Sequence, residues 1–186
     1  VLIFLLPMGL IVLQKETGSA LVYLAFFLVM YREGMSGVFL FTGVCAVIYF
    51  IVGIKYDEIP FMESPTSLGL FSVFSLIIAF TILMVWVYMK RKDVARNILL
   101  AAIVLIGGSV LALKYIEVFN LEKMFWLLTG LIIGYLIFLA IKNRKLVFFW
   151  IALFTAGSVM FFYSSDYVFD EILEPHQRIR IKVVLG

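Results

Sequence analysis

Long apolar runs, separated by short polar segments, constrain this 186-residue chain more than any other feature. A helix that crosses a bilayer needs about 20 apolar residues, and roughly 17–25 are tolerated. Backbone polar groups in hydrocarbon must be satisfied within the segment, so each such run is predicted to be helical. Runs that meet or approach this length are Met35–Ile54, Leu68–Met89, Ile98–Leu113, Met124–Ile141 and Leu146–Tyr163.

Two shorter apolar runs precede these five. Leu2–Leu13 is too short to span, and we interpret it as the end of a span in a longer protein rather than as a signal peptide, because the chain starts at Val1 within the run. Ser19–Tyr31 would span only if Gln14–Gly18 dipped toward the headgroups. The sequence therefore predicts an all-α, polytopic transmembrane helix bundle of about six to seven spans. Residues 1–186 form one membrane domain in this interpretation.

The composition agrees with a membrane protein. Hydrophobic residues make up 65% of the chain and charged residues 15%, against roughly 45–50% and about 25% in soluble domains. Cys45 is the single cysteine and lies in an apolar run, so no disulfide framework is expected within the chain. With His176 as the single histidine, a zinc site of the usual ligand number is excluded. The bases are scattered over short loops without an aromatic platform, so no nucleic acid partner is expected.

The polar segments alternate in charge along the chain. One set holds eight bases and two acids, a net charge of +6, and consists of residues 31–36, 90–97 and 142–145. The other set holds seven bases and ten acids, a net charge of −3, and consists of residues 14–18, 55–67, 114–123 and those after 163. By the positive-inside rule the first set is cytoplasmic and the second faces outward.

Few residues within the runs suggest a function. Gly130 and Gly134 form a G-x-x-x-G pair, and Gly107 and Gly108 are adjacent. We interpret both pairs as sites of close helix packing rather than of chemistry. No charged residue lies at the centre of a run, which argues against a proton relay or an ion pathway in this part of the protein.

The first of two notable polar segments is Gln14–Leu21, between the two shorter runs. A structural explanation is a capping turn. Glu16 would then lie favourably near the positive end of a helix that starts at Ser19. Gly18 would supply a backbone angle that other residues resist.

The second is Leu173–Arg180, within the long polar stretch 164–186. It could be an interfacial helix whose arginines contact lipid phosphates. Alternatively, Arg178 and Arg180 could bind a pyrophosphate, because a guanidinium donates two parallel hydrogen bonds to one phosphate group. Pro175 would fix the entry to this segment.

Together the two segments resemble the signatures of the SEDS family, which includes RodA, FtsW and SpoVE. Gln14–Leu21 resembles the pattern Q-P-D-L-G-T-A-L, with Lys15, Glu16, Thr17 and Ser19 at the differing positions. Leu173–Arg180 resembles L-k-P-Y-Q-R-x-R, with His176 in place of tyrosine. The second segment is closer to the RodA branch than to FtsW.

The resemblance covers the two ends of the chain better than its middle. Typical members have about two spans between these motifs, whereas six are predicted here. The excess is even, so Leu173–Arg180 stays on the outer face. We interpret residues 55–145 as an inserted transmembrane block of unknown purpose, and residues 164–186 as the start of a large extracytoplasmic loop.

The resemblance implies a peptidoglycan glycosyltransferase. Such an enzyme polymerises lipid II at the outer face of the bacterial cytoplasmic membrane, alongside a class B penicillin-binding protein, in elongation and cell shape. By the same resemblance Arg178 and Arg180 contact the pyrophosphate, Gln177 and His176 support the loop, and Gln14 and Glu16 line an outer cleft. The general base is an aspartate expected beyond Gly186. A divalent cation bound at the pyrophosphate is compatible with the resemblance.

Two alternatives from other functional classes stay open. One is a flippase or other transporter of a lipid-linked precursor, suggested by the many spans and the outward basic cluster. The other is a non-catalytic membrane scaffold that docks a penicillin-binding protein.

Overall fold

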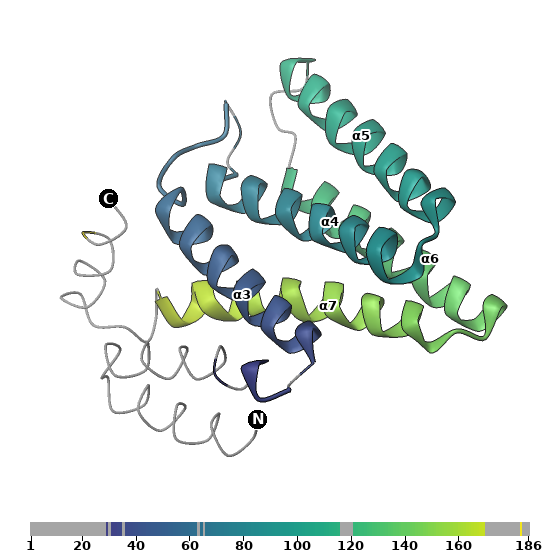
Figure 1. Ribbon diagram of the computed structural model, residues 1–186. Coiled ribbons are helices and arrows are strands. Elements are labelled where there is room, and N and C mark those ends of the chain that lie inside the picture. The colour runs from purple at the N-terminus through teal and green to yellow at the C-terminus, as the bar shows by residue number, and fades with distance from the viewer. Residues whose placement is uncertain are drawn as a thin grey trace.

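The computed structural model describes residues 29, 31–34, 36–62, 64, 66–115, 121–169 and 183. Within these residues the chain forms the helices labelled in Figure 1. They are α3 (Gly37–Lys55), α4 (Leu68–Met89), α5 (Lys92–Tyr115), α6 (Leu121–Asn143) and α7 (Leu146–Tyr167). All five are long and apolar enough to cross a membrane. The prediction of an all-α, polytopic membrane bundle is confirmed.

The helix bounds differ most from the predicted runs at α5. This helix begins at Lys92, six residues before the apolar run that starts at Ile98. Its first turn is polar on the outside, but Val94 and Ala95 on the other side are buried against the bundle. A search for continuous apolar sequence therefore misses a turn that is amphipathic.

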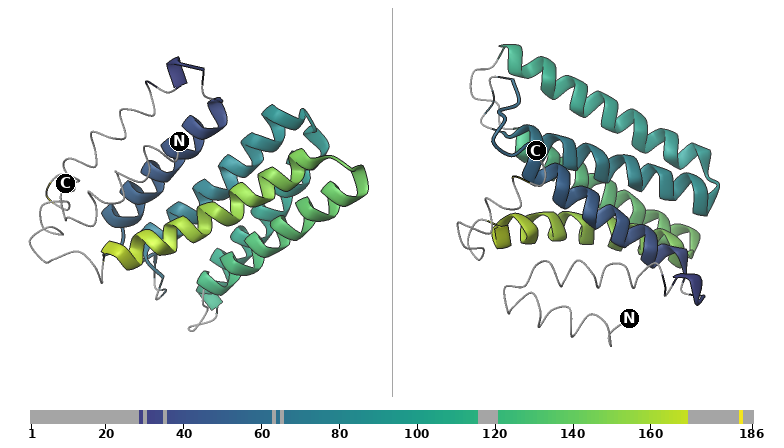
Figure 2. Two further views of the ribbon diagram at one scale, coloured as in Figure 1. Left: turned by 90° about the horizontal axis from the view of Figure 1, so that it is seen from below. Right: turned by 60° about the vertical axis from the view of Figure 1, so that its left-hand side comes forward.

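The helices run up and down through the bundle, each antiparallel to the one before it (Figure 1). Two-residue connections after α4 and after α6 force this arrangement, because short loops join antiparallel neighbours. Lys90 and Arg144 adopt a left-handed backbone in these turns, each with φ 50°. α4 contacts all four other helices, whereas α5 lies at one edge against α4 and α6 (Figure 2).

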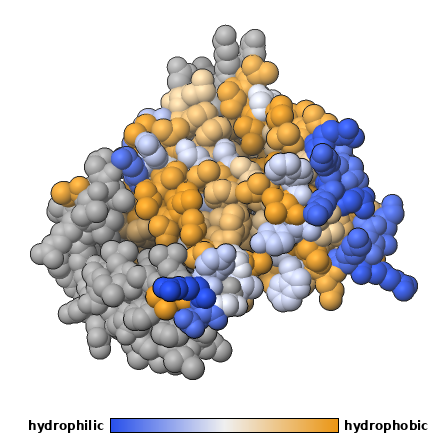
Figure 3. Space-filling view, viewed as in Figure 1, coloured by the Kyte–Doolittle hydropathy of each residue, from blue (hydrophilic) through white to orange (hydrophobic). Residues whose placement is uncertain are grey.

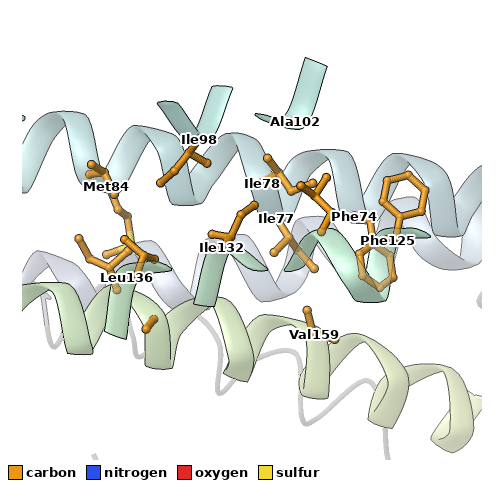
Figure 4. Close-up of a cluster of buried hydrophobic side chains, with 14 of the residues drawn as sticks. Phe74, Ile77, Ile78, Met84, Ile98, Ala102, Phe125, Ile132, Leu136 and Val159 are labelled. Carbon is orange, nitrogen blue, oxygen red and sulfur yellow. The ribbon is translucent and has the colours of Figure 1, made fainter. Parts of the chain in front are cut away.

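The core lies where α4, α5, α6 and α7 meet (Figure 4). Phe74 and Ile77 of α4, Ile132 and Leu136 of α6, and Val159 of α7 are all buried there. Between membrane helices such burial gives little hydrophobic driving force, since lipid tails are as apolar as leucine. Close packing and a few interhelical hydrogen bonds must therefore stabilise the bundle.

Among the described glycines, Gly53 and Gly69 make the tightest contacts with neighbouring segments. A Cβ atom added to Gly69 would lie 2.5 Å from the carbonyl oxygen of Gly53, and one added to Gly53 would lie 2.8 Å from the Phe162 ring. These two glycines let α3, α4 and α7 pack tightly.

The glycines predicted as packing sites behave differently. A Cβ built on Gly107, Gly108, Gly130 or Gly134 meets no atom within 4 Å among the described residues. The prediction that they pack closely against another helix is wrong for the described helices. Their exposed faces point away from the core.

On the face shown in Figure 3, the described residues form a largely apolar band, and hydrophilic residues gather where the α4–α5 and α6–α7 connections lie. Large apolar side chains are exposed along the band, including Val104, Leu131, Phe138 and Met160. Five consecutive antiparallel helices put the start of α3 and the end of α7 at opposite ends of the bundle. The start of α3 lies at the same end of the bundle as the two basic connections.

Candidate functional site

The predicted site residues all lie outside the described residues: Gln14, Glu16, His176, Gln177, Arg178 and Arg180. Their arrangement stays a prediction. The structure instead describes the helices that lead to them, since α7 ends at Tyr167, six residues before Leu173. It also describes three features that bear on function: the end of the bundle where α6 starts and α7 ends, a buried polar contact, and a groove.

The end of α7 is tied to the start of α6. Tyr163 donates a hydrogen bond of 2.9 Å to Oε1 of Glu122, and both side chains are partly buried. The indole of Trp126 stacks on the Tyr163 ring, with the ring centroids 5.2 Å apart. Amphipathic aromatic rings of this kind are typical of membrane–water interfaces. This contact fixes the last turns of α7, from which the chain continues toward Leu173–Arg180.

The loop that joins α3 to α4 lies at the same end of the bundle and is folded back onto α4. Pro60 and Ser67 form an antiparallel bridge. The Phe61 ring stacks on Phe71 of α4 with centroids 4.0 Å apart. The Ser67 hydroxyl accepts a hydrogen bond of 3.2 Å from the Leu70 backbone N–H and so caps α4. At this end, aromatic rings of the α3–α4 loop, α4, α6 and α7 pack against one another.

A buried threonine pair links α4 to α7. The Oγ1 atoms of Thr81 and Thr155 lie 2.9 Å apart, and both residues have no exposed surface. Each hydroxyl also lies within hydrogen-bond distance of the carbonyl four residues earlier in its own helix. One threonine can therefore donate to the other, while the acceptor donates to its own helix. Such bonds stabilise membrane helix pairs by roughly 0.6 kcal/mol on average, so we interpret this contact as structural.

A groove of about 660 Å³ opens between α3, α7 and the last turns of α4. Its lining is mostly apolar, with Phe39, Trp150 and Phe154 among the larger side chains. Of its polar residues, Ser36, Thr42 and Tyr88 lie toward the basic loops, whereas Tyr49 and Ser158 lie farther along α3 and α7. Sequence reasoning missed the groove, because its residues are spread over three separate apolar runs.

The described residues contain no group of three or more histidine, cysteine, aspartate or glutamate side chains that could hold a metal ion. The divalent cation that the family resemblance allows at the pyrophosphate is not tested by this observation. Its ligands stay a prediction.

No protein-family model, curated protein or solved structure matches the chain. A functional proposal must therefore be built from the residues of the two polar motifs and from the arrangement of the described helices.

Proposed function

We propose that this chain belongs to a RodA-like peptidoglycan glycosyltransferase, which polymerises lipid II at the outer face of the bacterial cytoplasmic membrane. One observation carries the proposal. Two segments, Gln14–Leu21 and Leu173–Arg180, resemble the two signatures of the SEDS family and occur in the family's order. Either segment alone would be weak support.

The order of the described helices supports the outward placement of the second segment. The chain enters α3 from the basic segment 31–36 and crosses the bundle five times before it leaves α7. An odd number of crossings brings residues after Tyr167 to the face opposite the basic loops. Because basic loops stay in the cytoplasm, that face is the outer one.

The first segment reaches the same face if residues 19–31 cross the membrane once, as the sequence predicts. Both motifs would then flank one outer site. The fixed outer end of the bundle supports such a site, since the Tyr163–Glu122 hydrogen bond holds the helix from which Leu173–Arg180 follows.

The chemistry requires a base and a group of cations. A base removes the proton from the sugar hydroxyl that attacks, and cations stabilise the lipid pyrophosphate that departs. We assign the second task to Arg178 and Arg180, whose planar guanidinium groups can each donate two hydrogen bonds to a phosphate. His176 and Gln177 hold this segment in place. Gln14 and Glu16 line the facing side of the cleft.

The partner and the cellular role follow from the same resemblance. A class B penicillin-binding protein would cross-link the strands that this enzyme makes, and the RodA-like form of Leu173–Arg180 is the basis for proposing a role in elongation and cell shape. These assignments depend on the glycosyltransferase proposal.

A polymerisation assay separates this function from a flippase and from a scaffold. The full-length protein, purified in detergent with its penicillin-binding partner, is expected to convert labelled lipid II into glycan strands that form a ladder on a gel. Detergent removes the two compartments that a flippase needs, so strand formation there requires an enzyme. A folded preparation that makes no strands, while the same protein in vesicles moves lipid II between leaflets, would support the flippase instead.

A further inference from the structure

The groove between α3, α7 and the last turns of α4 begins at the end of the bundle next to the basic loops and extends past the middle of α7. Its lining on α7 runs from Val147, near the start of the helix, to Phe161. These positions are 14 residues apart, which corresponds to about 21 Å along the helix. One leaflet of the hydrocarbon core is roughly 15 Å thick. The groove is therefore long enough to run through the whole leaflet on the basic side.

The volume of the groove indicates which kind of molecule could occupy it. A helix about 10 Å in diameter and 21 Å long would fill on the order of 1,600 Å³, well above the 660 Å³ of the groove. A methylene group is similar in size to a water molecule, whose share of the liquid is roughly 30 Å³. A chain of about 16 carbons would then need on the order of 500 Å³. The groove fits one acyl chain better than a helix.

Two basic residues stand close in sequence to residues that line the groove. Lys90 follows Tyr88 by two residues, and Lys145 precedes Val147 by two, so both lysines belong to the connections that adjoin lining residues. Both lysines are exposed. Of the acids at this end, Asp93 is paired with Arg91 at 2.7 Å, and Glu33 lies in the segment before α3. An anionic headgroup would be attracted to the two lysines.

We infer that this groove binds one acyl chain of an anionic phospholipid from the cytoplasmic leaflet, with its headgroup at Lys90 and Lys145. Tyr88, which is half exposed, would sit at the level of the headgroup with its hydroxyl toward water. The inference does not depend on the proposed glycosyltransferase, because it rests on residues of α3, α4 and α7 and on none of the residues of the two motifs.

Trp150 provides the test, since it lines the groove and is 62% exposed. The full-length protein with Trp86→Phe and Trp126→Phe, and with any tryptophan beyond these residues also replaced, is placed in phosphatidylcholine vesicles. Phosphatidylglycerol or phosphatidylcholine brominated in the acyl chains is then added. Bound lipid quenches Trp150 fluorescence. Half-maximal quenching is expected at a membrane fraction of brominated phosphatidylglycerol that is roughly fivefold lower than the fraction of brominated phosphatidylcholine needed. A fivefold preference corresponds to the attraction of an anionic lipid by about one well-placed base.

Variants of groove residues and of the two lysines test whether the preference for phosphatidylglycerol arises at the groove. Gly157→Phe should remove it, because Gly157 lines the groove and a Cβ there meets no described atom within 4 Å, so the ring can fill the space. Gly134→Phe is the matched control, with equal room but on α6, and should keep the preference. Lys90→Gln with Lys145→Gln should reduce it without filling the groove. Equal quenching by both brominated lipids in the parent, the result expected if another part of the chain occupies the groove, would overturn the inference. So would a preference that survives both Gly157→Phe and the double lysine change.

Discussion

Replacement of Arg178 by alanine in the full-length protein is expected to lower the rate of lipid II polymerisation on the order of 10²- to 10³-fold. That is the usual effect of removing one donor that stabilises developing charge in a transition state. Insertion into the membrane should not change, because Arg178 belongs to a polar segment and not to a predicted span. The measurement is the initial rate of strand formation from labelled lipid II at equal amounts of membrane-inserted protein.

Two further variants separate charge from hydrogen-bond geometry. Arg178→Lys keeps the charge but loses the planar fork, so an intermediate rate is expected. Arg96→Ala is the control, since Arg96 is an exposed base on α5 at the basic end of the bundle, and it should leave the rate within twofold. A normal rate for Arg178→Ala would refute the assignment of this residue to the pyrophosphate.

Gly69→Ala is expected to destabilise the bundle by about 3 kcal/mol, at the upper end of the usual cost of overpacking. The added Cβ would lie 2.5 Å from the Gly53 carbonyl oxygen and 3.1 Å from backbone atoms of Tyr56 and Asp57. Backbone atoms cannot turn aside as the end of a flexible side chain can, so α3 and α4 must separate. Unfolding in mixed micelles with rising dodecyl sulfate, followed by circular dichroism, measures the change.

Gly134→Ala provides the comparison for this prediction. It lies in a helix of the same bundle, but its Cβ would meet no described atom within 4 Å. Alanine should be neutral there or stabilising by up to about 1 kcal/mol, since glycine is a poor helix former. If the two alanine variants unfold at the same detergent fraction, the close contact between α3 and α4 is not as described.

The positions of the helices along the chain could be predicted from the sequence, whereas the contacts between the helices could not. Runs such as Leu68–Met89 match the observed helix from end to end, because the length of an apolar run is set by the bilayer. The sequence does not indicate which side of each helix faces its neighbours. A helix that is apolar all round carries no stripe that marks the buried face. Gly53 and Gly69 therefore carry no signal in the sequence, and the G-x-x-x-G pair Gly130 and Gly134, although its pattern predicts a packed face, is exposed among the described helices.

The functional features divide in the same way. Arg178 and Glu16 can be identified as candidate site residues from the sequence, because each stands in a polar segment whose residue types suggest a chemistry. Their roles remain predictions. The threonine pair and the groove had no such signal. Thr81 and Thr155 are 74 residues apart, and only the antiparallel order of α4 and α7 brings their hydroxyls together. The groove depends on three helices whose contacts no single run encodes.

The most direct test asks on which side of the membrane the two motifs emerge. In a Cys45→Ala background of the full-length protein, with any further cysteines also replaced, single cysteines replace Lys15, Glu171 or Lys145, and intact cells with a permeabilised outer envelope are treated with a membrane-impermeant maleimide. Labelling is expected at positions 15 and 171 from outside, and at position 145 only after the cytoplasmic membrane is opened. Labelling of positions 15 and 171 from opposite sides, or of position 145 from outside, would contradict a shared outer site for lipid II.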